Sequence, residues 1–314
     1  MIAYDNKEQI TDGKSEFMRE TEKKAPLFPA FEAFVASEPD LRNPKGSLAA
    51  KLPRILGQGR TKTTHLDLPP APIERRMELA SLKLPVDMQV PGGVVVEIES
   101  VKREMTRILT ELATADGKRR IAVESLRELS HQSSGQENNH YFAGGLVLVE
   151  TNRAREWSWS LTPHYPLVSK IPPDVDYIAK AFRAAQELLR SLVLPVEEFE
   201  SKLTLAWRMA RHFSSNDDVL LVDVARMFKI AQQDHRFWQI PQKQFFRDSP
   251  EASFIANLIN WRRGTADSGT ASFELVPATL SQAHGPSAKP FFVPANPQGT
   301  QVKPMIYLRF RGRV

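Results

Sequence analysis

The feature that most constrains this chain is a series of apolar residues spaced alternately three and four apart between positions 98 and 129. This spacing repeats every seven residues and is typical of helices that pack lengthwise against another helix. Charged residues flank it, as they do in paired helices. The apolar face contains Ile98, Val101, Met105, Ile108, Leu112, Leu126 and Leu129. We expect this face to bind a larger protein partner or a second copy of the chain.

Three structures fit this pattern. The first is a continuous helix of roughly 48 Å, at about 1.5 Å per residue. The second is a helical hairpin that turns at Asp116 and Gly117, because glycine costs about 1 kcal/mol inside a helix and adopts positive φ easily. Arg119 occupies an apolar position of the repeat and favours this break. In the third, the face is one wall of a globular helical core and binds no partner.

The residues before this face, 1–93, are predicted to form an extended, proline-rich arm rather than a domain. Ten prolines lie between positions 26 and 91 and prevent any long regular element. Two short apolar stretches, 27–35 and 48–56, are typical of a segment that becomes ordered when it docks on a partner or on its own chain. Disorder without docking is the alternative.

Residues 140–213 are predicted to form a β-hairpin followed by two packed helices. The expected strands, 145–150 and 155–161, flank a short polar turn, and Trp157 and Trp159 lie on one strand face. The two tryptophans are either a platform for stacking nucleic-acid bases or part of the core.

Two amphipathic helices are expected after the hairpin. Apolar residues recur at helical spacing from Val175 to Leu192 and again from Val196 to Phe213. Pro195 lies between the two series, where it ends the first helix and begins the second. The two helices should therefore pack through their apolar faces.

The remaining residues, 214–314, are predicted to form a winged-helix-like module. Residues 222–240 resemble a helix-turn-helix, with small and apolar residues in part of the expected pattern. Lys229 stands where a glycine is usual and His235 where an apolar residue is usual, so the match is partial. Another helix is expected after Ser249, which is a good N-cap residue.

Two strands, 271–276 and 305–310, should close this module, separated by a loop far longer than a hairpin needs. Alternation places arginines on one side of the last strand. We expect phosphates of DNA or RNA to be bound by Arg262, Arg263, Lys303, Arg309, Arg311 and Arg313. The alternative is a charged edge strand whose arginines only keep it soluble.

Composition limits the chemistry open to the chain. It has no cysteine, which excludes disulfides, thiolate metal sites and a cysteine nucleophile. The net charge of +5 permits an anionic partner. The first residues lack the apolar core of a signal peptide, and no apolar run is long enough to span a membrane. We therefore expect a cytoplasmic protein.

Searches for catalytic motifs identify no enzyme class. Residues 57–64 resemble a phosphate-binding loop, but no glycine precedes Lys62. Glu200 and Lys202, with Asp174 or Asp176 upstream, imitate the acidic set of metal-dependent nucleases but lie on predicted helices rather than at strand ends. The histidines show no metal-ligand spacing. We expect no enzymatic activity, no metal, no cofactor and no small-molecule substrate.

The sequence thus predicts a mainly α protein with a minor β part, of the α+β class. Its expected parts are the arm (1–93), the heptad helix or hairpin (94–131), the β-hairpin with two helices (140–213) and the winged-helix-like module (214–314). The favoured function is an accessory subunit of a nucleic-acid-engaging complex, for example a partner of a coiled-coil ATPase. The alternative is a structural or assembly protein of a phage particle or a secretion-type machine, without nucleic-acid binding.

Overall fold

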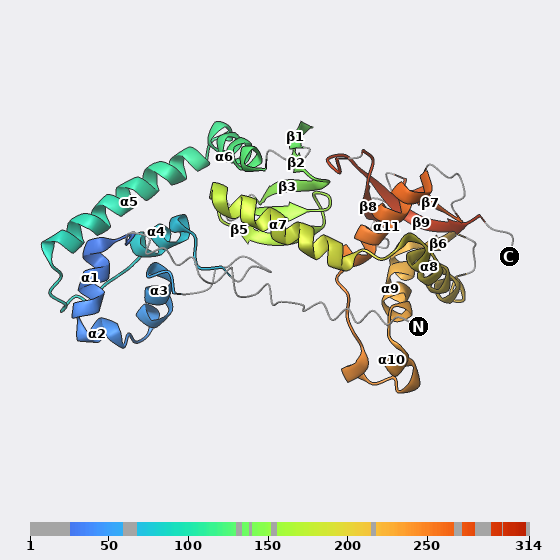
Figure 1. Ribbon diagram of the computed structural model, residues 1–314, viewed down its shortest axis with the longest axis horizontal. Helices are drawn as coiled ribbons and strands as arrows, with labels where there is room; N and C mark the ends of the chain where they lie inside the picture. Colours follow the sequence, from blue (N-terminus) through green and yellow to red (C-terminus); the bar gives the residue numbers. More distant parts are fainter. Residues whose placement is uncertain are drawn as a thin grey trace, which may run out of the picture.

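The computed structural model describes residues 26–58, 68–129, 134–137, 140–151, 156–214, 218–266, 272–279, 290–296 and 298–311. It contains helix and sheet, with 54% of the described residues helical and 18% in strands, which confirms the α+β class. Three parts follow one another along the longest axis (Figure 1). They are a group of N-terminal helices, a central five-stranded sheet and a C-terminal unit built on a four-stranded sheet.

The described part of the segment expected to be an extended arm, 26–58 and 68–93, is mostly helical, which corrects that prediction there. Its helices are α1 (Pro29–Ser37), α2 (Pro39–Arg42), α3 (Ser47–Ile55) and α4 (Pro72–Ala80). A proline begins α1, α2 and α4, where the missing N–H has no helical partner and the fixed φ suits the helix. The prolines therefore limit helix length, to nine residues at most, without preventing helices.

The heptad face is divided between two helices, α5 (Gly92–Leu112) and α6 (Ala115–Glu128). The chain breaks at Ala113 and Thr114 rather than at the expected turn, so the continuous helix is wrong. The hydroxyl of Thr114 caps α6 by accepting a hydrogen bond of 3.0 Å from the N–H of Gly117. Helix α5 packs against α1 and α4, whereas α6 packs against α7 (Val175–Leu192).

The apolar face of α5 and α6 is covered by other helices of the same chain. Six of its seven residues are buried, and Ile108 is partly buried against the core. The buried ones are Ile98, Val101, Met105, Leu112, Leu126 and Leu129. This burial agrees with the interpretation of the pattern as a wall of a helical core, and a partner helix could reach these side chains only by displacing α1, α4 or α7.

The central sheet is an antiparallel meander with strands in sequence order. Its strands are β1 (Ser134–Glu137), β2 (His140–Ala143), β3 (Leu146–Thr151), β4 (Glu156–Ser160) and β5 (Pro166–Ile171). The predicted hairpin is confirmed as β3 and β4. Trp157 and Trp159 are both buried, and the indole N–H of Trp159 donates to the carbonyl of Ile178 in α7 at 2.8 Å. The core interpretation of this pair is confirmed, and a base-stacking platform there is excluded.

The C-terminal unit interleaves helices and strands. In order it contains α8 (Val196–Arg211), β6 (Asp218–Leu220), α9 (Leu221–Ala231), α10 (His235–Gln239), the 3-10 helix η1 (Lys243–Phe245), α11 (Glu251–Ala266), β7 (Phe273–Pro277), β8 (Phe291–Pro294) and β9 (Val302–Phe310). Strand β9 lies between β6 and β7 and also pairs with β8. The edge-strand interpretation of 305–310 is therefore wrong, and the long loop before it contains a strand.

Candidate nucleic-acid interface

Arg309 in β9 and Arg311 just after it form ion pairs with acids on the neighbouring strands. The Arg309 guanidinium donates to the two carboxylate oxygens of Asp218 in β6 at 2.6 and 2.8 Å. Glu274 in β7 lies 3.7 Å from Arg309 and 3.2 Å from Arg311. The hydrogen bond from Arg309 lowers the pKa of Asp218 below its usual value. A phosphate would have to compete with these carboxylates, so the arginine row has less unpaired positive charge than the sequence indicates.

The other predicted cations occupy different surroundings. The half-buried Arg262 donates to the carbonyl of Pro294 at 3.2 Å, and burial lowers its pKa. Arg262 and Arg263 line a cavity of about 360 Å³ at the end of α11. Lys303 is exposed opposite Val293 of β8, and Arg313 lies outside the described residues. The structure thus brings Arg309 together with Arg311, and Arg262 together with Arg263.

Helix α11 cannot serve as a groove-reading helix because it is surrounded by the rest of the chain. Its residues 253–259 and Trp261 are buried, and it packs against α7, α8, α9 and β8. Its buried Asn257 accepts from the N–H of Leu194 at 2.7 Å and donates to the carbonyl of Leu192 at 2.8 Å. These bonds tie α11 to the turn between α7 and α8.

The partial helix-turn-helix also differs from the expectation. Its first helix, α9, is present and buries one face, which contains Leu221, Val224, Ala225, Phe228 and Ala231. Its second, α10, has five residues and none is buried. Pro241 explains this length, because the residue before a proline is driven out of the helical region, and Ile240 has φ −134° and ψ 88°.

Residues 234–247, which include α10 and η1, form what we call the aromatic projection. Figure 1 shows α10 at the end of a loop that extends away from both sheets. Its exposed apolar side chains are Trp238 (50% exposed), Ile240 (49%) and Phe246 (36%). Single exposed apolar residues are ordinary, but a cluster on one protruding segment is typical of a contact surface.

The two ends of the aromatic projection are joined by a buried amide. The Gln233 side chain donates to the carbonyl of Lys229 at 2.5 Å and to that of Arg247 at 2.9 Å. It also accepts from the N–H of Arg247 at 2.8 Å. Lys229 and Asp248 form a salt bridge of 2.7 Å beside this clamp. The base is therefore fixed although the tip is exposed.

Within the aromatic projection the rings contact one another rather than the core. Phe237 lies 5.9 Å from Trp238 and 5.7 Å from Phe246, measured between ring centroids. The Arg236 guanidinium lies 5.3 Å from the centroid of Phe245. Exposed rings beside cations are the combination with which proteins bind nucleic-acid strands, because bases stack on rings and cations attract phosphates.

The sequence contains a signal for this surface that the helix-turn-helix comparison obscured. From His235 to Arg247 there are four aromatic residues, three Lys or Arg residues and three glutamines, with no Asp or Glu. Interleaved rings and cations without acids are typical of surfaces on which nucleic-acid strands stack. The local sequence pattern could not show that these rings are exposed in the folded protein.

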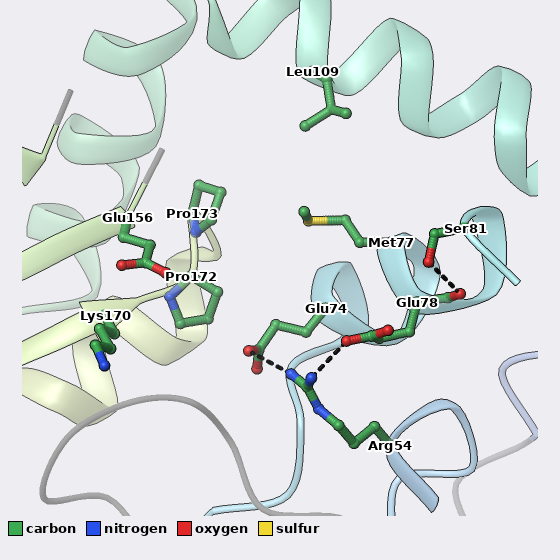
Figure 2. A pocket seen from close by; sticks show the side chains of 10 residues that line it. All are labelled: Arg54, Glu74, Met77, Glu78, Ser81, Leu109, Glu156, Lys170, Pro172 and Pro173. Atoms are coloured by element: carbon green, nitrogen blue, oxygen red, sulfur yellow. Dashed lines mark hydrogen bonds and ion pairs between the residues drawn. The ribbon is translucent and has the colours of Figure 1, made fainter. Parts of the chain in front are cut away.

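A second concave site lies between the N-terminal helices and the central sheet (Figure 2). It has a volume of about 300 Å³. Arg54 reaches two carboxylates of α4, Glu74 at 3.7 Å and Glu78 at 2.5 Å. Lys170, at its opposite side, has an unusual positive φ of 59°. Because its Arg54 is engaged by two carboxylates, this cavity offers a weaker basis for a function than the aromatic projection.

The nuclease-like set does not assemble. Asp174 caps α7 by accepting from the N–H of Tyr177 at 3.2 Å, and burial raises its pKa. Glu200 lies in α8, beyond the far end of α7, whose 18 residues span about 27 Å. Lys202 pairs with Glu198 at 3.2 Å. The loop-like residues 57–64 lie mostly outside the described part of the chain.

Two further findings concern the described residues only. No three His, Asp or Glu side chains among them gather as a metal site would require. None of their helices combines the length and the apolar character that crossing a membrane requires.

Comparison with known proteins finds no matching family model, no similar curated protein and no similar solved structure.

Proposed function

We propose that the chain is a non-enzymatic accessory subunit of a nucleic-acid-engaging complex and that it contacts DNA or RNA through the aromatic projection. The observation that carries this proposal is a protruding segment with a half-exposed Trp238, three cations and no acid between His235 and Arg247. Its cations attract phosphates and its rings accept bases.

The topology of the C-terminal unit supports the proposal. In a winged helix the order is helix, strand, helix, helix, strand, strand, with the last strand in the centre of the sheet. If α10, η1 and β8 are treated as insertions, the order α8, β6, α9, α11, β7, β9 and the sheet order β6-β9-β7 resemble this arrangement. The aromatic projection lies between the second and third helices, at the turn that precedes the groove-reading helix in a helix-turn-helix.

The test compares two double variants that each remove two positive charges. Arg236→Gln with Lys243→Gln should weaken binding to short DNA or RNA and reduce the slope of log K against log salt by roughly 1.4 to 1.8, since each phosphate contact contributes about 0.7 to 0.9. The control, Arg309→Gln with Arg311→Gln, should change the slope little because Asp218 and Glu274 already neutralise these arginines. Equal losses in both variants, or no binding at low salt, would contradict the proposal.

A larger protein partner, for example a coiled-coil ATPase, remains part of the proposal, but at a different surface from the buried heptad face. Three exposed valines near the start of α5 support this placement. They are Val86 (104% exposed), Val95 (46%) and Val96 (66%).

The second candidate function is that of a structural or assembly protein, in a phage particle or a secretion-type machine. It is favoured by Phe213, which is 81% exposed and lies at a cavity of about 450 Å³ on α8 and α9. Large apolar side chains beside a cavity are typical of subunit contacts. This function predicts stable homo-oligomers without nucleic acid, so a monomer at high concentration in analytical ultracentrifugation would exclude self-assembly.

A further inference from the structure

We propose that the aromatic projection binds unpaired bases, so that its ligand is single-stranded DNA or RNA, or a single-stranded stretch beside a duplex. This inference rests on the proposed function and deepens it by naming the class of nucleic acid. The observations that carry it are the exposure of the rings, the shortness of α10 and the burial of α11.

The rings are arranged to receive bases rather than to stabilise the fold. Phe237 contacts Trp238 and Phe246 edge to face, so the outer two rings pack against a neighbour without being enclosed. Both remain substantially exposed, at 50% and 36%. Every base has a π-face, so such rings bind a strand with little dependence on its sequence, provided that its bases are not already stacked in a duplex.

The geometry disfavours reading of an intact duplex. A helix that reads the major groove presents several polar side chains to base edges. Helix α10 has five residues, and its centre is occupied by Phe237 and Trp238. Helix α11, the other helix of suitable position, is buried over most of its length, residues 253–259 and Trp261. The rings could insert into a duplex only after neighbouring base pairs were unstacked, and this unstacking costs free energy. Binding to a single strand avoids this cost because its bases are not held in a duplex.

The charges of the aromatic projection fit an extended strand. Arg236, Lys243 and Arg247 distribute positive charge along it, while Asp234 and Asp248 lie at its base, where they contact Arg247 and Lys229 respectively. The tip is therefore free of acids that would repel phosphates. The three glutamines add donors and acceptors for base edges, and two of them, Gln242 and Gln244, hydrogen bond to each other at 2.7 Å.

The clamp at Gln233 makes this surface suitable for binding. Two hydrogen bonds between the Gln233 amide and the backbone of Arg247 fix the two ends of the aromatic projection to each other. A third hydrogen bond anchors the same amide to the carbonyl of Lys229 in α9. A segment that is already positioned loses less conformational entropy when it binds, so more of the stacking energy appears as affinity.

The tryptophans of the chain provide a selective spectroscopic test. Trp238 is 50% exposed, whereas Trp157, Trp159, Trp207 and Trp261 are at most 4% exposed. A base that stacks on Trp238 should quench its emission and protect it from acrylamide. We expect both effects when the full-length protein is titrated with single-stranded DNA or RNA, and neither with a duplex of equal length at equal occupancy. Separate titrations with oligo-dT and oligo-U distinguish DNA from RNA.

The matched variants remove rings without removing charge. Trp238→Ala and Phe246→Ala should each lower the affinity for a single strand about tenfold. This factor corresponds to the free energy that one base contributes when it stacks on one aromatic ring. The salt slope should stay unchanged, because no cation is lost. The control is Phe213→Ala, which removes an exposed ring from the end of α8 and should leave the affinity unchanged.

The outcomes separate this inference from the function on which it rests. Equal affinity for single strands and duplexes, with no quenching of Trp238, would overturn base stacking while leaving a cationic nucleic-acid contact in place. Failure to bind either form at low salt would overturn both, and the occupant of the aromatic projection would then be a protein.

Discussion

At the scale of single residues, Gly117 shows how one small side chain sets the path of the chain. A Cβ at this position would overlap the carbonyl oxygen of Glu111, the last turn of α5. Its φ is not positive, so close approach rather than backbone freedom explains the glycine. Together with the Thr114 cap, it allows α6 to leave the direction of α5 and pack on α7.

Gly117→Ala should therefore destabilise the protein by about 1–3 kcal/mol, because the added methyl group meets backbone that must shift. Urea unfolding followed by circular dichroism measures this change. Gly93→Ala is the matched control, since a Cβ there meets nothing within 4 Å and alanine is the better helix former. An equal effect of the two changes would show that close packing at Gly117 is unimportant.

Gln233 is the residue that holds the aromatic projection. Replacing it with alanine leaves the Arg247 N–H without its acceptor, and such a loss typically costs about 1–3 kcal/mol when the group is buried. We expect Gln233→Ala to accelerate amide hydrogen exchange across residues 234–247 far more than elsewhere. Gln239→Ala, at an exposed position on the tip, should leave exchange at the base unchanged. Uniform acceleration over the whole chain would instead indicate global destabilisation.

At the scale of elements, the contact of β8 with the segment before β5 joins the two sheets. The Phe292 N–H donates to the Tyr165 hydroxyl at 3.0 Å, and His164 stacks on the Phe292 ring at 3.8 Å. Burial raises the pKa of Tyr165 to about 12. The neutral phenol is thus favoured in the folded state.

The sign of the resulting pH dependence follows from this raised pKa. Tyr165 contributes its stability fully below its ordinary pKa of 10.0, and the contribution is lost as the pH rises through about 12. The free energy of unfolding should therefore decrease between about pH 9 and about pH 11. This decrease should be larger for the unmodified protein than for the Tyr165→Phe variant. Urea midpoints at both pH values measure the difference. Parallel decreases would mean that Tyr165 titrates normally.

At the scale of the whole molecule, the aromatic projection adds surface without adding core. None of the residues in α10 or η1 is buried, so their removal should leave both sheets and their helices intact. We expect a variant in which residues 235–246 are replaced by a short Gly-Ser linker to retain its circular dichroism spectrum and its melting temperature within a few degrees, while losing single-strand binding. A large drop in melting temperature would show that the segment is structural.

The helices and strands that could be predicted from the sequence are those determined by residues close to one another along the chain. The apolar spacing and the Asp174 cap locate α7, and Pro195 locates the start of α8. Alternation locates the hairpin of β3 and β4 and the strand β9. These signals act between residues that are close along the chain, so no knowledge of the rest of the fold is needed.

Tertiary structure alone decided how these elements are used. Asp218 and Arg309 are 91 residues apart, so their pairing, which neutralises the predicted cationic surface, has no local signal. The heptad face is the same in sequence whether a partner or α1 and α4 cover it. Conversely, the aromatic projection has a clear composition, but only the fold leaves its rings exposed. Periodicity in the sequence indicates which face of an element is apolar. Whether that face is buried, and which charges on it are paired, depends on the distant residues that the fold packs against it.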